Sequence, residues 1–261
     1  PTLYYQCSNH AGMGGQANTN SLFGSSNFSG SIQSTVSAGT TQGFSIVKVA
    51  KSNTNVATIG HGLGVIPKFI IGKDLDGADN WTCYSEFIGN AKGIYLNATN
   101  AEVSASTFWN STSPTSSVFT IGSDNTWNSP SILYYCFADV KGYSKFGKYV
   151  GNGNANGTFV YTGFKPAWIM SKSYSNTESW IIKDATRDPV NPADTNLAAN
   201  SANSESTWGT EYDIDILSNG FKMRDTAGQT NGNGYDFIYL AFAENPFVGN
   251  DSGTAVPATA R

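Results

Sequence analysis

The chain has 261 residues, a formal net charge of −4, a sequence pI of about 5.1, and only 13% charged residues. The low charge, without any Lys/Arg cluster, excludes the positive surface that nucleic-acid binding requires. No apolar run approaches the roughly 20 residues of a membrane-spanning helix, so we expect neither a nucleic-acid nor a membrane partner. Aromatic residues, at 13%, are sufficient to build hydrophobic cores.

The N-terminal region, residues 1–43, is rich in Gly, Ser, Asn and Thr and has little periodicity, which is typical of a linker or an irregular surface segment. Its first residues, Leu3–Gln6, resemble Leu133–Cys136 further along the chain. They are either the end of an upstream repeat, in a longer tandem array, or a short aromatic strand that occurs there by chance.

From Phe44 onward the sequence repeats itself. The apolar run after Pro67 returns after Pro166, and Trp81 and Trp109 return as Trp180 and Trp208, each at an offset of 99 residues. A unit of this length is too long for a solenoid coil but fits an independently cored domain. We therefore predict repeat 1 at residues 44–142, repeat 2 at residues 143–248, and a C-terminal tail at residues 249–261.

Within each repeat, strand signals dominate. Short apolar runs alternate with turn residues, and Asn219-Gly220 between two apolar runs is typical of a β-hairpin. The runs 68–73 and 236–243 are apolar on both faces, which indicates central strands. The pattern predicts an all-β chain of two tandem, jelly-roll-like β-sandwich domains, without long helices.

The duplication distinguishes residues that the fold needs, which are kept in both copies, from residues that are free to have a function. We interpret the residues kept in both copies as structural, namely Trp81, Trp180, Trp109, Trp208, Pro67 and Pro166. Trp127 has no duplicate and lies in a polar loop with Asp124 and Asn125. These three residues are our candidate ligand-binding site, in which the ring stacks on a sugar or a partner; alternatively, Trp127 anchors its loop.

The loop with Asp74, Asp76 and Asp79 has the alternating oxygen ligands that Ca²⁺ prefers. It lacks the complete twelve-residue pattern, and the second copy does not keep it, so a solvated hairpin turn is favoured over a weak calcium candidate. We expect no metal and no cofactor. We also expect no structural disulfide, because Cys136 replaces Ala241 in an apolar strand and the number of cysteines is odd.

No catalytic set recurs in the chain, and we expect that it is not an enzyme. A glycan hydrolase would need two carboxylates about 5–9.5 Å apart across a groove. The acidic candidates for such a pair form no motif; they are Glu86, Glu102, Asp184, Asp188, Glu205 and Glu211.

Several long stretches resemble tandem-repeat virion proteins of marine bacteriophages, commonly described as tail-fibre or tail-associated proteins. The stretches are residues 135–149, 159–168, 217–222 and 241–247, and the resemblance extends from about residue 30 to 248. It implies β-sandwich modules strung in copies on the surface of a phage particle, assembled in the host cytoplasm. It brings no catalytic residues to this sequence.

The leading hypothesis is therefore a structural and adhesive virion protein, whose loops bind a host-surface glycan or protein. Weak contacts would be strengthened by copy number. Its expected partners are other copies of itself, in a homo-oligomer such as a trimer, and other virion proteins. The alternatives are a head decoration or spacer protein without a ligand, and, least favoured, a tailspike-like glycan hydrolase.

Overall fold

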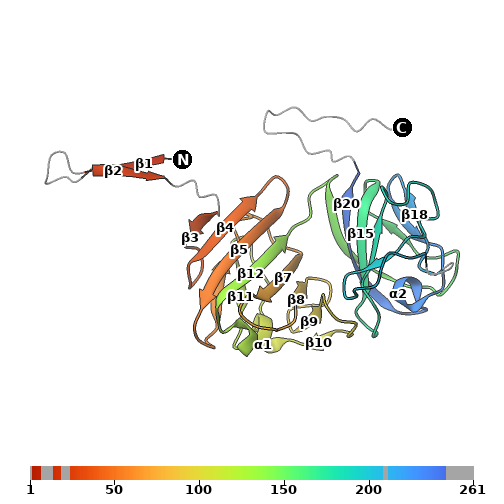
Figure 1. Ribbon diagram of the computed structural model, residues 1–261, viewed down its shortest axis with the longest axis horizontal. Coiled ribbons are helices and arrows are strands. Elements are labelled where there is room, and N and C mark those ends of the chain that lie inside the picture. Colours follow the sequence, from red (N-terminus) through yellow and green to blue (C-terminus); the bar gives the residue numbers. More distant parts are fainter. Residues whose placement is uncertain (1, 7–13, 19–23, 208–210, 245–261) are drawn as a thin grey trace.

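A computed structural model describes residues 2–6, 14–18, 24–207 and 211–244. In these ranges the chain is built almost entirely of antiparallel strands, and its two α-helices have four residues each (Figure 1). The all-β, sandwich-type fold predicted from the sequence is confirmed. No helix in the described part is long and apolar enough to cross a membrane.

Repeat 1 forms one long sheet with a small sheet against it. Its elements are β5 (Phe44–Lys51), β6 (Ala57–Gly60), β7 (Phe69–Asp74), β8 (Thr82–Ser85), β9 (Lys92–Tyr95), β10 (Val103–Ser104), α1 (Ser106–Trp109), β11 (Val118–Ile121), the 3₁₀ turn η1 (Asn125–Trp127) and β12 (Ser129–Phe137).

Repeat 2 follows after a short turn and has the same plan. Its elements are β13 (Ser144–Val150), β14 (Phe159–Tyr161), β15 (Pro166–Ser173), β16 (Ile181–Asp184), β17 (Leu197–Ala198), β18 (Ile214–Leu217), β19 (Gly220–Met223), α2 (Gly228–Asn231) and β20 (Asp236–Ala243).

The last strand of each repeat lies between its first and third strands. β12 pairs with β5 and β7, and β20 pairs with β13 and β15, all antiparallel. The small sheets also correspond, since β11 pairs with β6 and β19 pairs with β14. The predictions that runs 68–73 and 236–243 form central strands are confirmed, as is the hairpin, in which Leu217 faces Gly220 across a two-residue turn.

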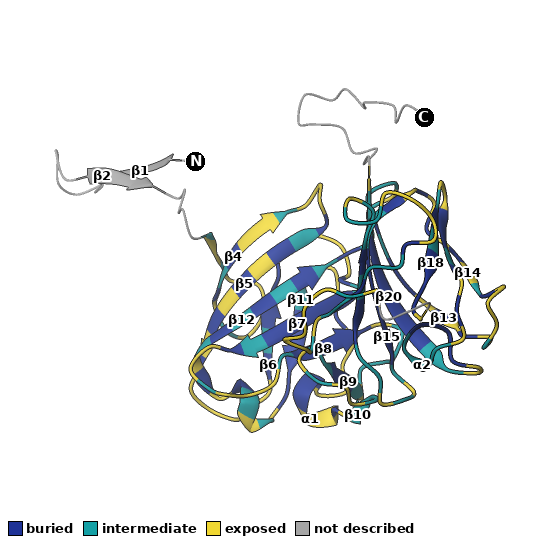
Figure 2. Ribbon diagram, turned by 45° about the vertical axis from the view of Figure 1, so that its right-hand side comes forward, coloured by how far each residue is buried: buried dark blue, intermediate teal, exposed yellow. Residues whose placement is uncertain are grey.

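The central strands divide their side chains between two different cores. In β20, Phe237 and Tyr239 point into the core of repeat 2, whereas Ile238 and Leu240 point to the other side of the sheet. There they meet residues of repeat 1 such as Phe69, so the two large sheets pack face to face (Figure 1). Each repeat closes its own apolar core, as predicted, and a third core joins the two repeats, which the sequence analysis did not predict (Figure 2).

The N-terminal boundary at residue 43 is wrong. The strands β3 (Ser25–Asn27) and β4 (Ser34–Gly39) extend the large sheet of repeat 1 at β5, so residues 25–39 belong to repeat 1 instead of forming a linker. Only Val36 in β4 gives an apolar signal, and it is buried in the core of repeat 1. A strand that carries a single buried apolar side chain has too weak a period-two pattern to be recognised in the sequence.

The first strand, β1 (Thr2–Gln6), pairs with β2 (Gly14–Asn18) in a separate two-stranded sheet. A strand at residues 3–6 was predicted and is confirmed. Its origin as the end of an upstream repeat stays a prediction.

The residues kept in both copies are structural where they are described. Trp109 is in the core of repeat 1, and Pro67 and Pro166 are buried at the starts of β7 and β15. Trp81 and Trp180 both pack in the core between the repeats, so they join the two repeats instead of filling each interior. Trp208 lies outside the described residues.

The turn after the third strand is also duplicated. Lys73 Nζ donates a hydrogen bond to Gly77 O at 2.8 Å, and Lys172 Nζ donates to Asn176 O at 3.3 Å, at the same offset of 99 residues. Lys172 is fully buried and also donates to Thr99 O of repeat 1, at 3.2 Å. Burial lowers the pKa of Lys172 to about 8.

Candidate functional site

The structure places Trp127 in the core, so its predicted role in binding a ligand is wrong. Its side chain has no exposed surface, and its Nε1 donates to Phe108 O at 3.0 Å. Asp124 begins the 3₁₀ turn η1 by accepting from Thr126 N, and it also accepts from Thr107 Oγ1. Asn125 is exposed, but the ring of Trp127 does not lie on the surface with it. The alternative, in which Trp127 anchors its loop, is confirmed.

The loop with Asp74, Asp76 and Asp79 is a turn held by hydrogen bonds. Asp74 Oδ1 accepts from Asp76 N at 2.9 Å, and Asp76 Oδ2 accepts from Ser129 Oγ at 3.1 Å. The Lys73 ammonium donates to the backbone oxygens of Gly77 and Asp79. No three His, Cys, Asp or Glu side chains within the described ranges are arranged to hold a metal ion.

Most of the acidic residues considered for glycan hydrolysis have partners elsewhere. Ion pairs join Glu86 with Lys68, Glu102 with Lys92, and Glu205 with Arg187. Asp184 accepts hydrogen bonds from backbone N–H groups in the turn after β16, and Asp188 accepts two from Thr195. Glu211 lines a pocket.

This pocket lies in repeat 2, at the end of the β18–β19 hairpin. It has a volume of about 350 Å³ and is lined by Ala155, Glu211, Asp213, Arg224, Asp225, Thr226 and Ala227. Asp213 precedes β18 and Arg224 follows β19, and the bond from Arg224 N to Asp213 O, at 2.8 Å, continues the hairpin into the pocket wall. The hairpin therefore brings together carboxylates that are distant in the sequence.

The two buried carboxylates of the pocket differ in their partners. Asp225 accepts from Ala227 N at 2.7 Å and from Thr230 Oγ1 at 2.9 Å. Asp213 is 8% exposed, and its Oδ1 is buried with no hydrogen-bond partner. Burial raises the pKa of both carboxyls above the ordinary value, and Asp213 also raises the pKa of Asp225. Such an orphaned acceptor is unusual in a folded protein.

A buried lysine lies near these carboxylates. Lys183 of β16 is 2% exposed, and its Nζ donates to Ala193 O at 2.8 Å. Burial lowers the pKa of Lys183 to about 8, although Asp188 and Asp213 act in the opposite direction. The residue at the corresponding position of repeat 1 is Tyr84, so the charge belongs to repeat 2 alone.

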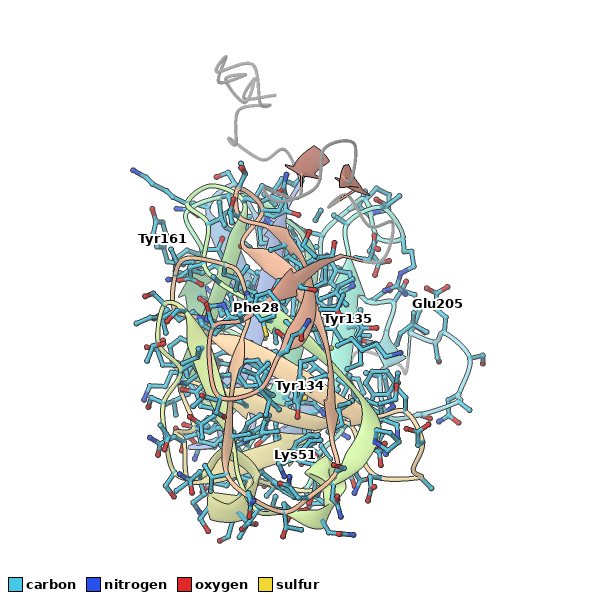
Figure 3. The ribbon with its side chains drawn as sticks, turned by 90° about the vertical axis from the view of Figure 1, so that its left-hand side faces the viewer. Phe28, Lys51, Tyr134, Tyr135, Tyr161 and Glu205 are labelled. Atoms are coloured by element: carbon cyan, nitrogen blue, oxygen red, sulfur yellow. The ribbon has the colours of Figure 1, made fainter. Side chains whose placement is uncertain are left out.

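The outer face of the neighbouring sheet carries two exposed aromatic side chains. Phe159 is 46% exposed and Tyr161 is 65% exposed, on the same side of β14, with Val160 buried between them. Tyr161 lies at the edge of the molecule in Figure 3. Lys222 lies opposite Phe159 and Gly220 lies opposite Tyr161 in β19.

Five functional candidates were not predicted from the sequence, namely Asp213, Asp225, Lys183, Phe159 and Tyr161. A signal was present. Lys183 follows two isoleucines at an inward position of its strand, and extending the predicted hairpin beyond Met223 sets Arg224 opposite Asp213.

Fold and site together define an all-β protein of two β-sandwich repeats with an acidic pocket in the second. A family model for a domain of unknown function, DUF7483, matches residues 17–246, and the chain belongs to this family. The match includes β3 and β4, in agreement with their place in repeat 1. Neither the curated proteins nor the solved structures contain a significant match to the chain.

Proposed function

We propose that this chain is a structural protein of a bacteriophage particle, a surface-exposed component of a tail fibre or related structure that attaches to the host. The observation that carries the proposal is the duplication, since two sandwiches fused through a common core form a rigid support for surface contacts. The surface is rich in hydroxyl and amide groups and poor in charge, which suits a long-lived extracellular particle.

The attachment role is supported by repeat 2. The exposed aromatic pair of β14 has no counterpart in β6 of repeat 1, whereas the strand plan occurs in both repeats. A fold that keeps its scaffold in both copies and changes one surface is suited to binding. The proposed activity is recognition without catalysis, and the proposed assembly is a homo-oligomer such as a trimer.

The experiment is to locate the chain in purified particles by immunogold labelling, with light scattering to determine the oligomer of the isolated protein. Label on the fibres and binding of the protein to host cells are expected. If purified particles lack the chain, the proposal is wrong. If label lies on the head and the protein does not bind host cells, the decoration or spacer alternative replaces it.

A further inference from the structure

We propose that the outer face of the β14–β19–β18 sheet, together with the pocket at its end, binds a neutral saccharide. This inference rests on the proposed attachment function and assigns it a site and a ligand class. Hereafter this surface is called the β14 face, defined by Phe159, Tyr161 and the pocket residues Asp213 and Arg224.

The aromatic side chains provide the apolar part of the site. Phe159 and Tyr161 are two residues apart in one strand, so their Cα atoms are separated by roughly 7 Å, which spaces two rings along an extended ligand. One face of a pyranose ring presents C–H groups, and these contact the electron-rich face of an aromatic ring favourably.

The pocket provides the polar part. Its volume of about 350 Å³ lies within the range of roughly 300–1,000 Å³ typical of small-ligand sites. Asp213 and Arg224 both line the pocket, where the carboxylate can accept from a sugar hydroxyl and the guanidinium can donate to it. Asp225 is held in place by Ala227 N and Thr230, so the second acceptor is preorganised.

The two parts are contiguous in the structure. β14 pairs with β19, which runs directly into the pocket residues Arg224 and Asp225. The loop before β14 supplies Ala155 to the pocket wall, and Gly157 N donates to Met223 O at 3.1 Å. A ligand seated in the pocket can therefore extend along β14.

Charge restricts the ligand class. Glu211, Asp213 and Asp225 line the pocket against one positive side chain, Arg224, which itself pairs with Asp215. An acidic polysaccharide is repelled by this excess of negative charge. A divalent cation is disfavoured because no three acidic, His or Cys side chains in the described ranges are arranged to hold one.

Repeat 1 has no equivalent surface. Its corresponding strand, β6, carries Thr58 and Gly60 beside the buried Ile59, and the N-terminal segment covers it. Ser31 N donates to Thr58 O, and Ser34 Oγ donates to Gly60 O. The inference therefore predicts one saccharide site per chain.

The experiment screens the full chain on an array of neutral and acidic glycans and then titrates the best neutral oligosaccharide by calorimetry. One site per chain is expected. Tyr161→Ala and Asp213→Asn should each weaken binding at least tenfold, while circular dichroism shows that both variants are folded. Phe28→Ala is the matched control, because Phe28 is an aromatic residue, 74% exposed, of the N-terminal segment outside the β14 face, and its removal should leave the affinity unchanged.

The outcomes separate this inference from the proposed function. If neutral glycans bind equally well to Tyr161→Ala and Asp213→Asn, the β14 face is not the site, although attachment by glycan binding stands. If the chain binds only acidic glycans, or binds host cells and no glycan, the saccharide class is wrong and attachment again stands. Ca²⁺ binding that Asp213→Asn abolishes, without any glycan binding, would also overturn the inference. Failure to bind both cells and glycans overturns inference and attachment together.

Discussion

Gly72 determines how Trp127 is buried in the core of repeat 1. A Cβ atom at this position of β7 would lie 2.7 Å from Trp127 Cη2 and 2.8 Å from Tyr134 Cε1, closer than atoms approach in folded proteins. Repeat 2 has Ser171 at the same position of β15, but no tryptophan corresponding to Trp127. The absence of a side chain at Gly72 therefore leaves the space that Trp127 fills in the core of repeat 1.

Replacing Gly72 by alanine should destabilise the protein by about 1–3 kcal/mol, the usual result of overpacking a core. Trp127→Phe in the Gly72→Ala background should recover part of the loss, because a smaller ring leaves room for the new methyl group. Ser171→Ala in repeat 2 is the matched control and should have a smaller effect. Urea unfolding measures all three, and equal effects at residues 72 and 171 would contradict this account.

His61 should make stability depend on pH. The side chain is fully buried, with Nε2 donating to Thr115 O and Nδ1 accepting from Leu63 N, and burial lowers its pKa. The unfolded chain takes up a proton near the ordinary pKa of about 6.5, before the folded chain does. Stability contributed by this site is thus complete above that pH and decreases as the pH falls toward the lowered pKa.

The comparison of the native chain with His61→Gln between pH 8 and pH 5 isolates this effect. Glutamine offers both a donor and an acceptor but does not titrate. The native chain should lose more unfolding free energy on acidification than the variant does. Parallel pH profiles would show that His61 does not contribute.

At the scale of the element, the N-terminal segment is the part of the fold that differs between the repeats. β4 pairs with β5 in repeat 1, whereas β13, the counterpart of β5, lies at the edge of its sheet. The reason is the connection between the repeats. Because β12 leads through a short turn directly into β13, no segment remains that could pair with β13 as β4 pairs with β5. Residues 25–39 therefore complete repeat 1 only.

If this assignment is correct, Val36→Asp should destabilise the protein by several kcal/mol, because it buries a charge in the core of repeat 1. Ser37→Asp is the control, since Ser37 is exposed on the opposite side of the same strand. Thermal unfolding compares the two variants. If residues 25–39 acted as a linker, both substitutions would be neutral.

Elements with strong local patterns could be predicted from the sequence. The alternation at residues 44–51, the apolar runs of β7 and β20, and the hairpin at Asn219 all carry their own signals. An apolar pattern on both faces of β20 shows that both faces are buried, but it does not show what covers them. The core between the repeats and the pocket at Asp213 depend on contacts between distant residues, and Trp127 is buried from within a polar loop.

At the scale of the whole molecule, the core between the repeats should make unfolding a single cooperative event. Trp180 of repeat 2 packs edge-on against Phe69 of repeat 1, and its Nε1 donates to Tyr95 O at 2.9 Å. Glu102 N donates to Tyr174 O at 2.7 Å across the same interface. Loss of these contacts affects both repeats at once.

Trp180→Ala should cost about 3–5 kcal/mol, as expected for removing a buried tryptophan. Amide hydrogen exchange should show reduced protection in both central strands, β12 and β20. The control is Phe28→Ala, which removes an exposed ring and should leave exchange unchanged. If β20 alone loses protection, the two repeats unfold independently.

The arrangement of the common core has a consequence for assembly. The positions that meet there are the same in both repeats, since Ile71 corresponds to Met170, Trp81 to Trp180 and Phe137 to Phe242. Such a contact is isologous, as in a twofold dimer, because both partners use the same surface. Once the two repeats are in contact, neither has that surface free for a further repeat. Adding a third repeat through this surface is therefore impossible, and any filament built from this chain must grow by pairs of repeats through a different surface.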